Sequence, residues 1–348
     1  MAKILIIRLS AIGDVAMTIP VIYSVAKAYP QDSFTILTQT FLIPVFVNRP
    51  ANVNVLGINT KGAEKSLSGL LRFTSALVKY DYDMVLDLHN IIRPWIIHTR
   101  FRLKGTPVYV IKRDRKARKQ LIQQKNKVFK PLYPVINSYA DVFRKAGFNF
   151  EITFTSLFDD AHPANLAELD SVLGKKTGKW IGIAPFAKHR GKIYPIDYME
   201  KVVETLSLRE DITLFLFGGR GYEEAVMEQW AYQYPRVHSM IGRYSLDSEL
   251  TLISRLDLLL SMDSANMHFA SLVGTRVLSV WGATHPYAGF YGFGQKQEDA
   301  IQLDLLCRPC SIYGKKKCYR GDWACMVQLM PEVIVEKVQN ALSDESRD

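Results

Sequence analysis

The chain has 348 residues, of which 48% are hydrophobic and 22% are charged, the proportions of an ordinary soluble globular protein. These proportions exclude a disordered chain, a coiled coil and a minimal disulfide scaffold. Forty-four Lys and Arg residues against 34 Asp and Glu give a net charge of +10, which favours a polyanionic partner such as nucleic acid, anionic lipid or a phosphorylated sugar. The sequence lacks an apolar run of about 18 residues, and its first residues lack the apolar region and cleavage site of a signal peptide. We therefore expect no membrane-spanning helix and predict a cytoplasmic protein.

In the first half of the chain, short apolar stretches alternate with helical ones. A β-branched apolar run such as residues 3–8 is typical of a buried parallel strand. Further strands are predicted at 34–37, 53–58, 84–88 and 108–111, and helices at 15–29, ended by Pro30, and at 67–80. This alternation predicts a doubly wound parallel sheet.

Residues 148–179 are rich in acids, Pro and Gly, and we interpret them as a linker before a second alternation. Strands are predicted at 180–184, 212–217, 256–260 and 277–281, and helices at 198–208, 223–232, 246–255, 264–272 and 331–342. We expect two Rossmann-like α/β domains, 1–165 and 166–348, with the last helix as a candidate for packing back on the first domain. Open α/β sheets bind ligands at the carboxyl ends of their strands.

The turn after the first strand, residues 10–14, is the first candidate functional site. Gly13 lets the backbone approach a ligand closely, and Asp14 lies at the start of a helix. An aspartate at such a place most often caps the helix, and this alternative stays open. A helix N-terminus also favours the ionised carboxylate, which suits a base that accepts a proton.

Three turns in the second half carry further candidates. Residues 262–268 open a helix with small polar residues, which offers N–H groups to a diphosphate; the alternative is Asp263 as N-cap and His268 in a packed interface. Residues 186–192 hold three cations and a histidine, which clamp phosphates if they face a cleft and otherwise form a solvated loop. Residues 218–223 lack the third glycine of the dinucleotide fingerprint, and no P-loop is present. Nicotinamide enzymes and P-loop ATPases are therefore disfavoured.

Residues 112–130 contain nine Lys and Arg residues and one acid, Asp114. Such runs are usually solvated surface, but this one supplies most of the net charge and so indicates an anionic partner. Only Phe129 is available for stacking on bases, so lipid phosphates or acidic sugars fit at least as well as nucleic acid.

The four cysteines, Cys307, Cys310, Cys318 and Cys325, begin with a Cys-x2-Cys pair that could form a structural zinc site. The other gaps are not those of a zinc finger or ribbon, and paired or free thiols are the alternative. The surrounding lysines are expected to lower the thiol pKa and so favour metal binding or oxidation. No catalytic metal is expected, because no His, Asp or Glu ligand set accompanies the cysteines.

Six short motifs occur in order along the chain: Ile-Ile-Arg-Leu-Ser-Ala-Ile-Gly-Asp-Val at 6–15, Lys192-Ile-Tyr-Pro195, Phe217-Gly-Gly219, Met240-Ile-Gly242 followed by Ser245-Leu246, Asp263-Ser264-x-x-Met267-His268, and Trp281-Gly282-x-Thr284-x-Pro286. In this combination the sequence resembles glycosyltransferase family 9, the bacterial ADP-heptose:lipopolysaccharide heptosyltransferases. The resemblance extends from the first strand to the cysteines.

The resemblance implies a GT-B fold, in which the first domain binds the acceptor and the second binds the nucleotide sugar. It also implies an inverting transfer that needs no metal or other cofactor, with Asp14 as the general base for the acceptor hydroxyl. The residues implied for the donor are Lys192 at the diphosphate; Asp263, His268 and the amides of Ser264 and Ala265 at the sugar and phosphates; and Gly219, Glu223 and Gly242 at the ribose and base.

The expected acceptor is anionic lipid A with its attached acidic sugars. We assign Gly13, Arg113, Arg115 and Lys116 to its binding, and expect a monomeric protein on the inner face of the inner membrane with no nucleic-acid partner. The alternatives are a transferase for another nucleotide sugar, a GT-B epimerase or hydrolase, and, more remotely, a basic nucleic-acid-binding protein.

Overall fold

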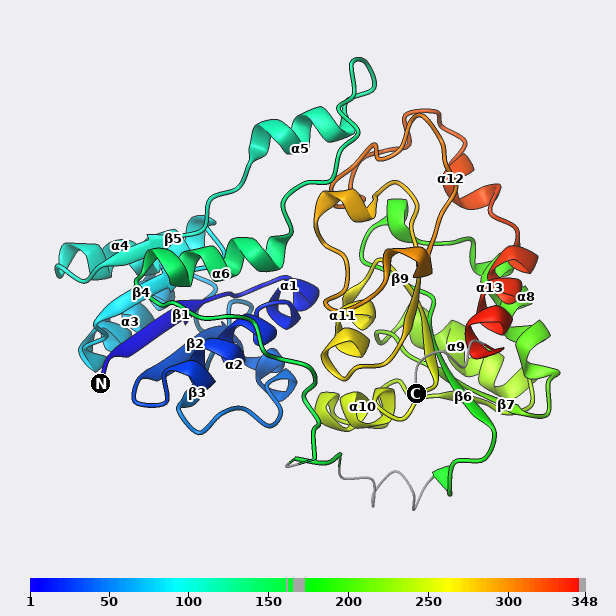
Figure 1. Cartoon of the computed structure of the whole chain (residues 1–348), viewed down its shortest axis with the longest axis horizontal. Coiled ribbons are helices and arrows are strands. Elements are labelled where there is room, and N and C mark those ends of the chain that lie inside the picture. Colours follow the sequence, from blue (N-terminus) through cyan, green and yellow to red (C-terminus); the bar gives the residue numbers. More distant parts are fainter. Residues whose placement is uncertain (161, 165–172, 344–348) are drawn as a thin grey trace. The chain divides into compact units, whose positions relative to one another are not determined.

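The computed structural model describes residues 1–160, 162–164 and 173–343, and it divides into two compact units (Figure 1). Unit 1 comprises Met1–Arg113 and Tyr133–Leu157, and unit 2 comprises Asp114–Leu132 and Phe158–Asp348. The chain therefore passes between the units three times. The predicted domain boundary, between 165 and 166, lies outside the described residues.

Unit 1 is built on a five-stranded parallel sheet of order β3-β2-β1-β4-β5. Its strands are β1 (Lys3–Ile7), β2 (Ser33–Gln39), β3 (Val53–Ile58), β4 (Met84–Asp87) and β5 (Val108–Val110). In register, Leu5 of the central strand β1 lies between Thr35 of β2 and Val85 of β4. The apolar runs form strands because helices cover both faces of such a sheet.

The helices of unit 1 return the chain between these strands. They are α1 (Ile12–Ala16), α2 (Ile19–Ala28), α3 (Leu67–Leu77), α4 (Ile92–Leu103) and α6 (Val135–Lys145), with 3-10 turns η1 (Thr40–Val45) and η2 (Val78–Tyr80). The predicted single helix at 15–29 is wrong, because it is broken between α1 and α2. An unbroken helix would press the Pro20 ring against the carbonyl of Ala16.

The start of the predicted linker is part of the packed structure. Phe148, Phe150 and Phe154 are buried in unit 1, and the Ser24 hydroxyl accepts hydrogen bonds from the backbone of Thr153 and Phe154 at 3.0 Å. These three aromatic side chains pack in the core of unit 1, although the acid-rich and Pro-rich composition of the segment predicted a linker.

Unit 2 is built on a six-stranded parallel sheet of order β11-β10-β9-β6-β7-β8. Its strands are β6 (Lys179–Ala184), β7 (Ile212–Leu216), β8 (Val237–Ser239), β9 (Leu258–Met262), β10 (Val277–Val280) and β11 (Ala300–Ile301). The sequence did not predict β8, which is three residues long in its paired part, or β11, which is two residues long. The strand predicted at 256–260 begins two residues before β9. Asp257 precedes β9, and its carboxylate accepts the backbone N–H of Trp180 at 2.7 Å.

Within the described residues of unit 2 the helices are α5 (Arg115–Ile122), α8 (Ile196–Ser207), α9 (Tyr222–Gln233), α10 (Leu246–Ile253), α11 (Ala265–Leu272), α12 (Ala324–Val327) and α13 (Pro331–Ser343), with 3-10 turns η3 (Arg190–Lys192), η4 (Pro286–Ala288) and η5 (Gln297–Asp299). The last helix, α13, packs on α8 and β9 of unit 2 through Ile334 and Val338. None of the helices in the described ranges is long and apolar enough to cross a membrane.

Candidate active site

Asp14 lies at the switch point of the first sheet, where the chain crossings leave β1 and β4 in opposite directions. Its Oδ1 is 2.8 Å from Arg8 Nη2 and accepts a hydrogen bond from the Tyr139 hydroxyl at 3.3 Å. Its Oδ2 accepts the N–H of Ala11, the N-cap of α1, at 3.2 Å. Asp14 therefore closes the first turn of α1 and also belongs to a charged cluster with Arg8.

Arg8 is buried beneath this carboxylate. Its Nη1 donates to the Leu88 carbonyl at 2.7 Å, and its guanidinium lies 5.6 Å from the Tyr139 ring centroid. Burial raises the pKa of Tyr139, so the hydroxyl stays protonated and remains a donor to Asp14. Arg8 and Tyr139 together fix the position of the carboxylate.

A buried aspartate orders the turn after β4. Asp87 accepts the backbone N–H groups of His89 and Asn90 at 2.8 Å, and lies 2.9 Å from His98 Nδ1. This turn places His89 Nδ1 3.3 Å from the Leu9 N–H and its Nε2 3.4 Å from the Ser10 hydroxyl. Burial, reinforced by the nearby Arg8, lowers the pKa of His89 to about 3. His89 is therefore a neutral brace for the turn that carries Asp14.

In unit 2, Lys192 and Asp263 meet at the switch point between β6 and β9. Lys192 Nζ lies 2.8 Å from Asp263 Oδ2, and the Thr284 hydroxyl donates to the same oxygen at 2.8 Å. The Asp263 side chain is 5% exposed and that of Lys192 is 18% exposed. This arrangement presents a cation at the carboxyl edge, while its counter-charge is held inside the fold.

Two neighbouring segments hold this pair in place. Gly314 has a φ of +74°, and a Cβ there would come within 2.7 Å of Lys192 Cγ, so the lysine stem packs directly on a glycine. Arg308 is buried and donates from Nη2 to the carbonyls of Trp281 and Thr284 at 3.0 Å. Thr284 is thereby fixed where it can donate to Asp263.

The other donor residues lie on α11, directly after Asp263. Ser264 is its N-cap, and its hydroxyl contacts that of Ser261 at 3.1 Å rather than capping the helix. Ala265 opens the helix, and His268 is buried one turn further along.

Gly219, Glu223 and Gly242 also come close together. The Gly219 N–H donates to Glu223 Oε2 at 2.7 Å. The Arg220 side chain packs against Gly242, because a Cβ on Gly242 would lie 3.2 Å from Arg220 Nη2. Gly242 also has a φ of +66°, which favours glycine at this position. The turns after β7 and β8 thus form one structure at the carboxyl edge of the second sheet.

The predicted acceptor residues divide between the units. Gly13 and Arg113 belong to unit 1, where Arg113 Nη2 donates to the His89 carbonyl. Arg115 and Lys116 begin α5 in unit 2.

Part of the basic stretch has a structural role. Lys127 Nζ donates to the carbonyls of Leu306 at 3.1 Å, Arg308 at 2.9 Å and Pro309 at 3.1 Å. Leu121 forms a small core with Ala288 and Ile312, and the Leu132 N–H donates to the Tyr287 carbonyl at 2.8 Å. Residues 114–132 are therefore anchored in unit 2.

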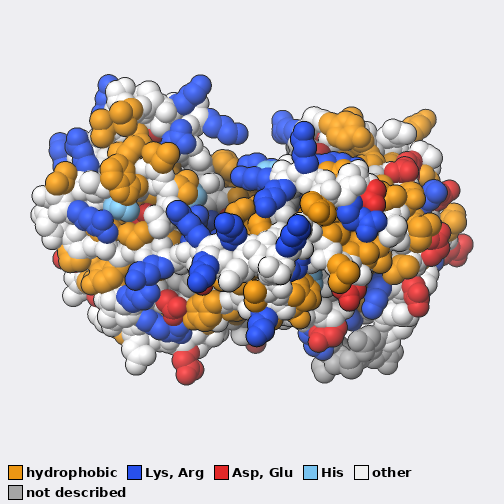
Figure 2. All heavy atoms as spheres, turned by 90° about the horizontal axis from the view of Figure 1, so that it is seen from above, with side chains coloured by type: hydrophobic (Ala, Val, Ile, Leu, Met, Phe, Trp, Pro, Cys, Tyr) orange, Lys and Arg blue, Asp and Glu red, His pale blue; other side chains and the backbone are white. Residues whose placement is uncertain are grey.

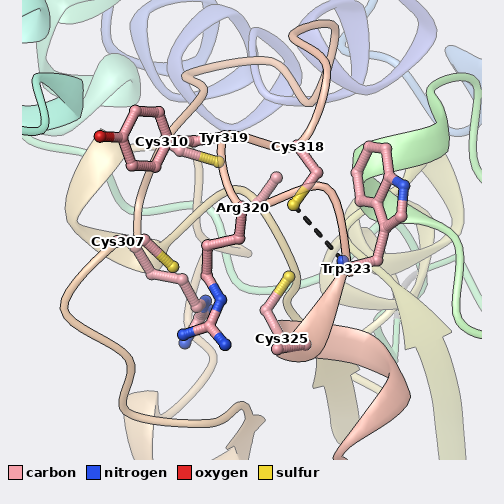
Figure 3. A pocket seen from close by; sticks show the side chains of 10 residues that line it. Cys307, Cys310, Cys318, Tyr319, Arg320, Trp323 and Cys325 are labelled. Carbon is pink, nitrogen blue, oxygen red and sulfur yellow. Dashed lines mark hydrogen bonds between the residues drawn. The ribbon is translucent and has the colours of Figure 1, made fainter.

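The four cysteines line one small cavity of about 10 Å³, together with Arg308, Arg320 and Trp323 (Figure 3). All four are free thiols, and Cys318 Sγ accepts the Trp323 N–H at 3.4 Å. Burial raises the pKa of Cys310, and raises that of Cys325 to about 11, so the predicted lowering of the thiol pKa is wrong for these two residues. The lysines near them in sequence do not offset their burial. Among the residues that the structure describes, no group of three or more His, Cys, Asp or Glu side chains is placed to hold a metal ion.

Two residues that support Asp14 or its turn, Tyr139 and His89, are not among the site residues predicted from the sequence. Both lie far along the chain from Asp14. Thr284 belongs to the motif at 281–286, but its contact with Asp263 was not predicted. His89 had a usable signal, because the polar pair His89-Asn90 directly follows the predicted strand at 84–88. Tyr139 had none, since its helix was not predicted.

Two doubly wound parallel sheets, each with a charged cluster at its switch point, define the class of fold: two Rossmann-like α/β units, as in the GT-B fold. Residues 70–319 match Glycosyltransferase family 9 (heptosyltransferase), and the chain belongs to this family. The family resemblance and the fold class predicted from the sequence are confirmed.

Relatives and solved structures agree with this assignment. The chain is 24% identical to lipooligosaccharide heptosyltransferase 2 of Campylobacter jejuni over 96% of each protein. It is 26% identical to an Escherichia coli lipopolysaccharide heptosyltransferase 3, over 78% of this chain and 81% of the relative. The structure of E. coli ADP-heptose lps heptosyltransferase II aligns with a TM-score of 0.72 at 16% identity and 99% coverage of both chains. That of E. coli heptosyltransferase WaaC with ADP-2-deoxy-2-fluoro heptose aligns at 0.68, with 16% identity and coverage of 97% of this chain and 99% of the other.

Proposed function

We propose that this heptosyltransferase moves a heptose from ADP-heptose to a lipopolysaccharide inner-core or lipid A acceptor, with inversion at the anomeric carbon. The names of its relatives support the acceptor class, and the ADP-2-deoxy-2-fluoro heptose bound to WaaC supports the donor.

In the proposed step the Asp14 carboxylate takes the proton of the acceptor hydroxyl. The acceptor oxygen forms a bond to the anomeric carbon, and the bond from that carbon to the diphosphate oxygen breaks. The electron pair of the broken bond leaves with ADP. Arg8 and Tyr139 are positioning residues that hold Asp14 Oδ1.

Unit 2 supplies the donor contacts in this proposal. Lys192 stabilises the negative charge that develops on the diphosphate. The ion pair with Asp263 already holds the ammonium group in position, so the site needs little reorganisation during the reaction. The N–H groups of Ser264 and Ala265 and the side chains of Asp263 and His268 bind the phosphates and sugar. The turns with Gly219, Glu223 and Gly242 receive the ribose and adenine.

We further propose that Gly13, Arg113, Arg115 and Lys116 bind the anionic acceptor and that the protein works as a monomer at the inner face of the inner membrane. No metal or other cofactor takes part in the proposed step. Lys127 is left out of the acceptor site, because it is committed to three carbonyl groups.

The observation that carries the proposed mechanism is the position of Asp14 at the first switch point, fixed by Arg8 and Tyr139. Asp14→Asn keeps the size of the side chain but removes the base. We expect it to lower acceptor-dependent release of ADP from ADP-heptose by about 100-fold or more, while donor binding measured by thermal shift stays unchanged.

Asp141→Asn is the matched control, because Asp141 is a carboxylate of unit 1 whose ion pair with Arg144 lies on α6. Normal turnover of Asp14→Asn would remove Asp14 from the mechanism. Release of ADP without any acceptor would favour a hydrolase or an epimerase over a transferase.

A further inference from the structure

Exposed apolar side chains gather at one edge of unit 1. The crossover segments begin where their strands end, at the carboxyl edge of the sheet, and six large apolar side chains that are at least 36% exposed lie there. They are Ile12 after β1, Phe41 after β2, Leu67 after β3, and Ile91, Ile92 and Trp95 after β4. This set, the apolar edge, lies on the same edge of the sheet as Asp14.

The first turn of α4 is its most prominent part. Ile92 is 78% exposed and Trp95 is 56% exposed, and at i and i+3 they are neighbours on the helix surface. Ile91, the N-cap, adds a third exposed side chain. Leaving such residues in water loses the free energy that their burial would provide, so a cluster of them marks a contact surface.

The charges beside the apolar edge are mainly positive. Lys61 and Lys65 follow β3, Arg93 follows β4, and Lys112 and Arg113 follow β5. The acids in these turns are engaged within the fold: Asp14 with Arg8, Asp87 with His98, Glu64 with the backbone N–H of Asn59, and Asp114 with the backbone N–H of Ala117. Figure 2 shows one face of the molecule, on which Lys and Arg side chains are more widespread than acidic ones.

We propose that the apolar edge docks on an anionic lipid bilayer, with Ile92 and Trp95 inserting below the head groups and the neighbouring Lys and Arg side chains contacting lipid phosphates. Apolar side chains flanked by cations are typical of proteins that bind at the membrane–water interface, and Trp side chains prefer the level of the lipid head groups. A negatively charged protein surface would complement the cations, but it would not bury this many apolar side chains.

This inference rests on the proposed function, because an enzyme with a lipid-linked acceptor must reach a bilayer. It adds a specific apolar surface, whose flanking cations include only Lys112 and Arg113 of residues 112–130, and it connects this surface with the edge that carries Asp14. The acceptor would then approach the base from the same side on which the protein meets the membrane.

The test is cosedimentation of the full chain with vesicles of phosphatidylethanolamine and phosphatidylglycerol at about 3:1, without donor or acceptor. The double variant Ile92→Ser, Trp95→Ser should bind these vesicles at least about tenfold more weakly than the wild type, since it removes the two apolar side chains that insertion into the bilayer would bury. Leu103→Ser is the matched control: Leu103 is 84% exposed at the other end of α4, at the amino edge of the sheet, and its loss should leave vesicle binding unchanged.

Bromine-labelled acyl chains should quench wild-type fluorescence more strongly than that of Trp95→Phe, because Trp95 is the only tryptophan of unit 1. Equal vesicle binding by the double variant and the wild type would overturn the proposal. A wild-type dimer that dissociates in the double variant would also overturn it, by showing a second copy on this surface. Since the assay contains no substrate, failure of heptose transfer would leave its result intact.

Discussion

The pair Lys192 and Asp263 allows the structural and chemical roles of one cation to be separated. Lys192→Met removes the charge but keeps much of the stem that packs on Gly314. It leaves the 5%-exposed Asp263 carboxylate with the Thr284 hydroxyl and without its ion pair. Breaking a buried pair in this way costs about 3 kcal/mol, at the lower end of the usual range because Lys192 itself is partly exposed.

That cost predicts a drop in the melting temperature of about 6–12 °C for a unit of this size. Lys192→Met combined with Asp263→Asn removes both charges, and the amide oxygen can still accept from Thr284. We expect the double variant to recover most of the lost stability. It should not recover activity, because the diphosphate still lacks its cation; we expect acceptor-dependent ADP release to stay about 100-fold or more below the wild type.

The measurements are thermal unfolding of the full chain and release of ADP from ADP-heptose in the presence of the acceptor. Wild-type turnover by Lys192→Met would refute the role assigned to this cation. A double variant no more stable than Lys192→Met would refute the ion pair as the source of the instability.

Two further predictions concern His89 and Lys127. Folding lowers the pKa of His89 from 6.5 to about 3, so the unfolded chain binds a proton at this residue first as pH falls. Unit 1 should therefore lose about 2 kcal/mol of stability between pH 6.5 and 5, and His89→Gln should remove that part of the loss. Hydrogen exchange of β1 and β4 peptides measures this stability, and an unchanged pH dependence in His89→Gln would contradict the prediction. Lys127→Met should speed tryptic cleavage within residues 112–130 about fivefold or more, because three carbonyl contacts are lost. Lys125→Met, which removes a neighbouring exposed lysine, should not, and equal rates for the two variants would show that Lys127 does not anchor the segment.

The sequence predicts the fold well where local patterns decide it. The apolar runs at 3–8 and 212–217 correspond to β1 and β7, and the turns that follow the strands contain Asp14, Lys192 and Asp263. These positions are readable because a parallel sheet needs continuous apolar strands and brings the turns after them to one edge.

What the sequence does not show depends on contacts between distant segments. Tyr139 meets Asp14 across 125 positions, and Lys127 meets the carbonyl of Leu306 across 179. The pKa of Cys325 is raised by burial, which composition near the cysteine does not report. Local charge patterns predicted that residues 112–130 carry an anion site, whereas tertiary contacts commit some of these residues to unit 2.

The path of residues 114–132 has a practical consequence for dividing the protein. A fragment that begins at Phe158 would contain all six strands of the second sheet but would lack α5 and with it Leu121, the partner of Ala288 and Ile312. It would also lack the ammonium group that binds the carbonyls before Cys310. Such a fragment is expected to aggregate or to need the missing peptide added in trans. Expression of unit 2 alone must therefore include residues 114–132.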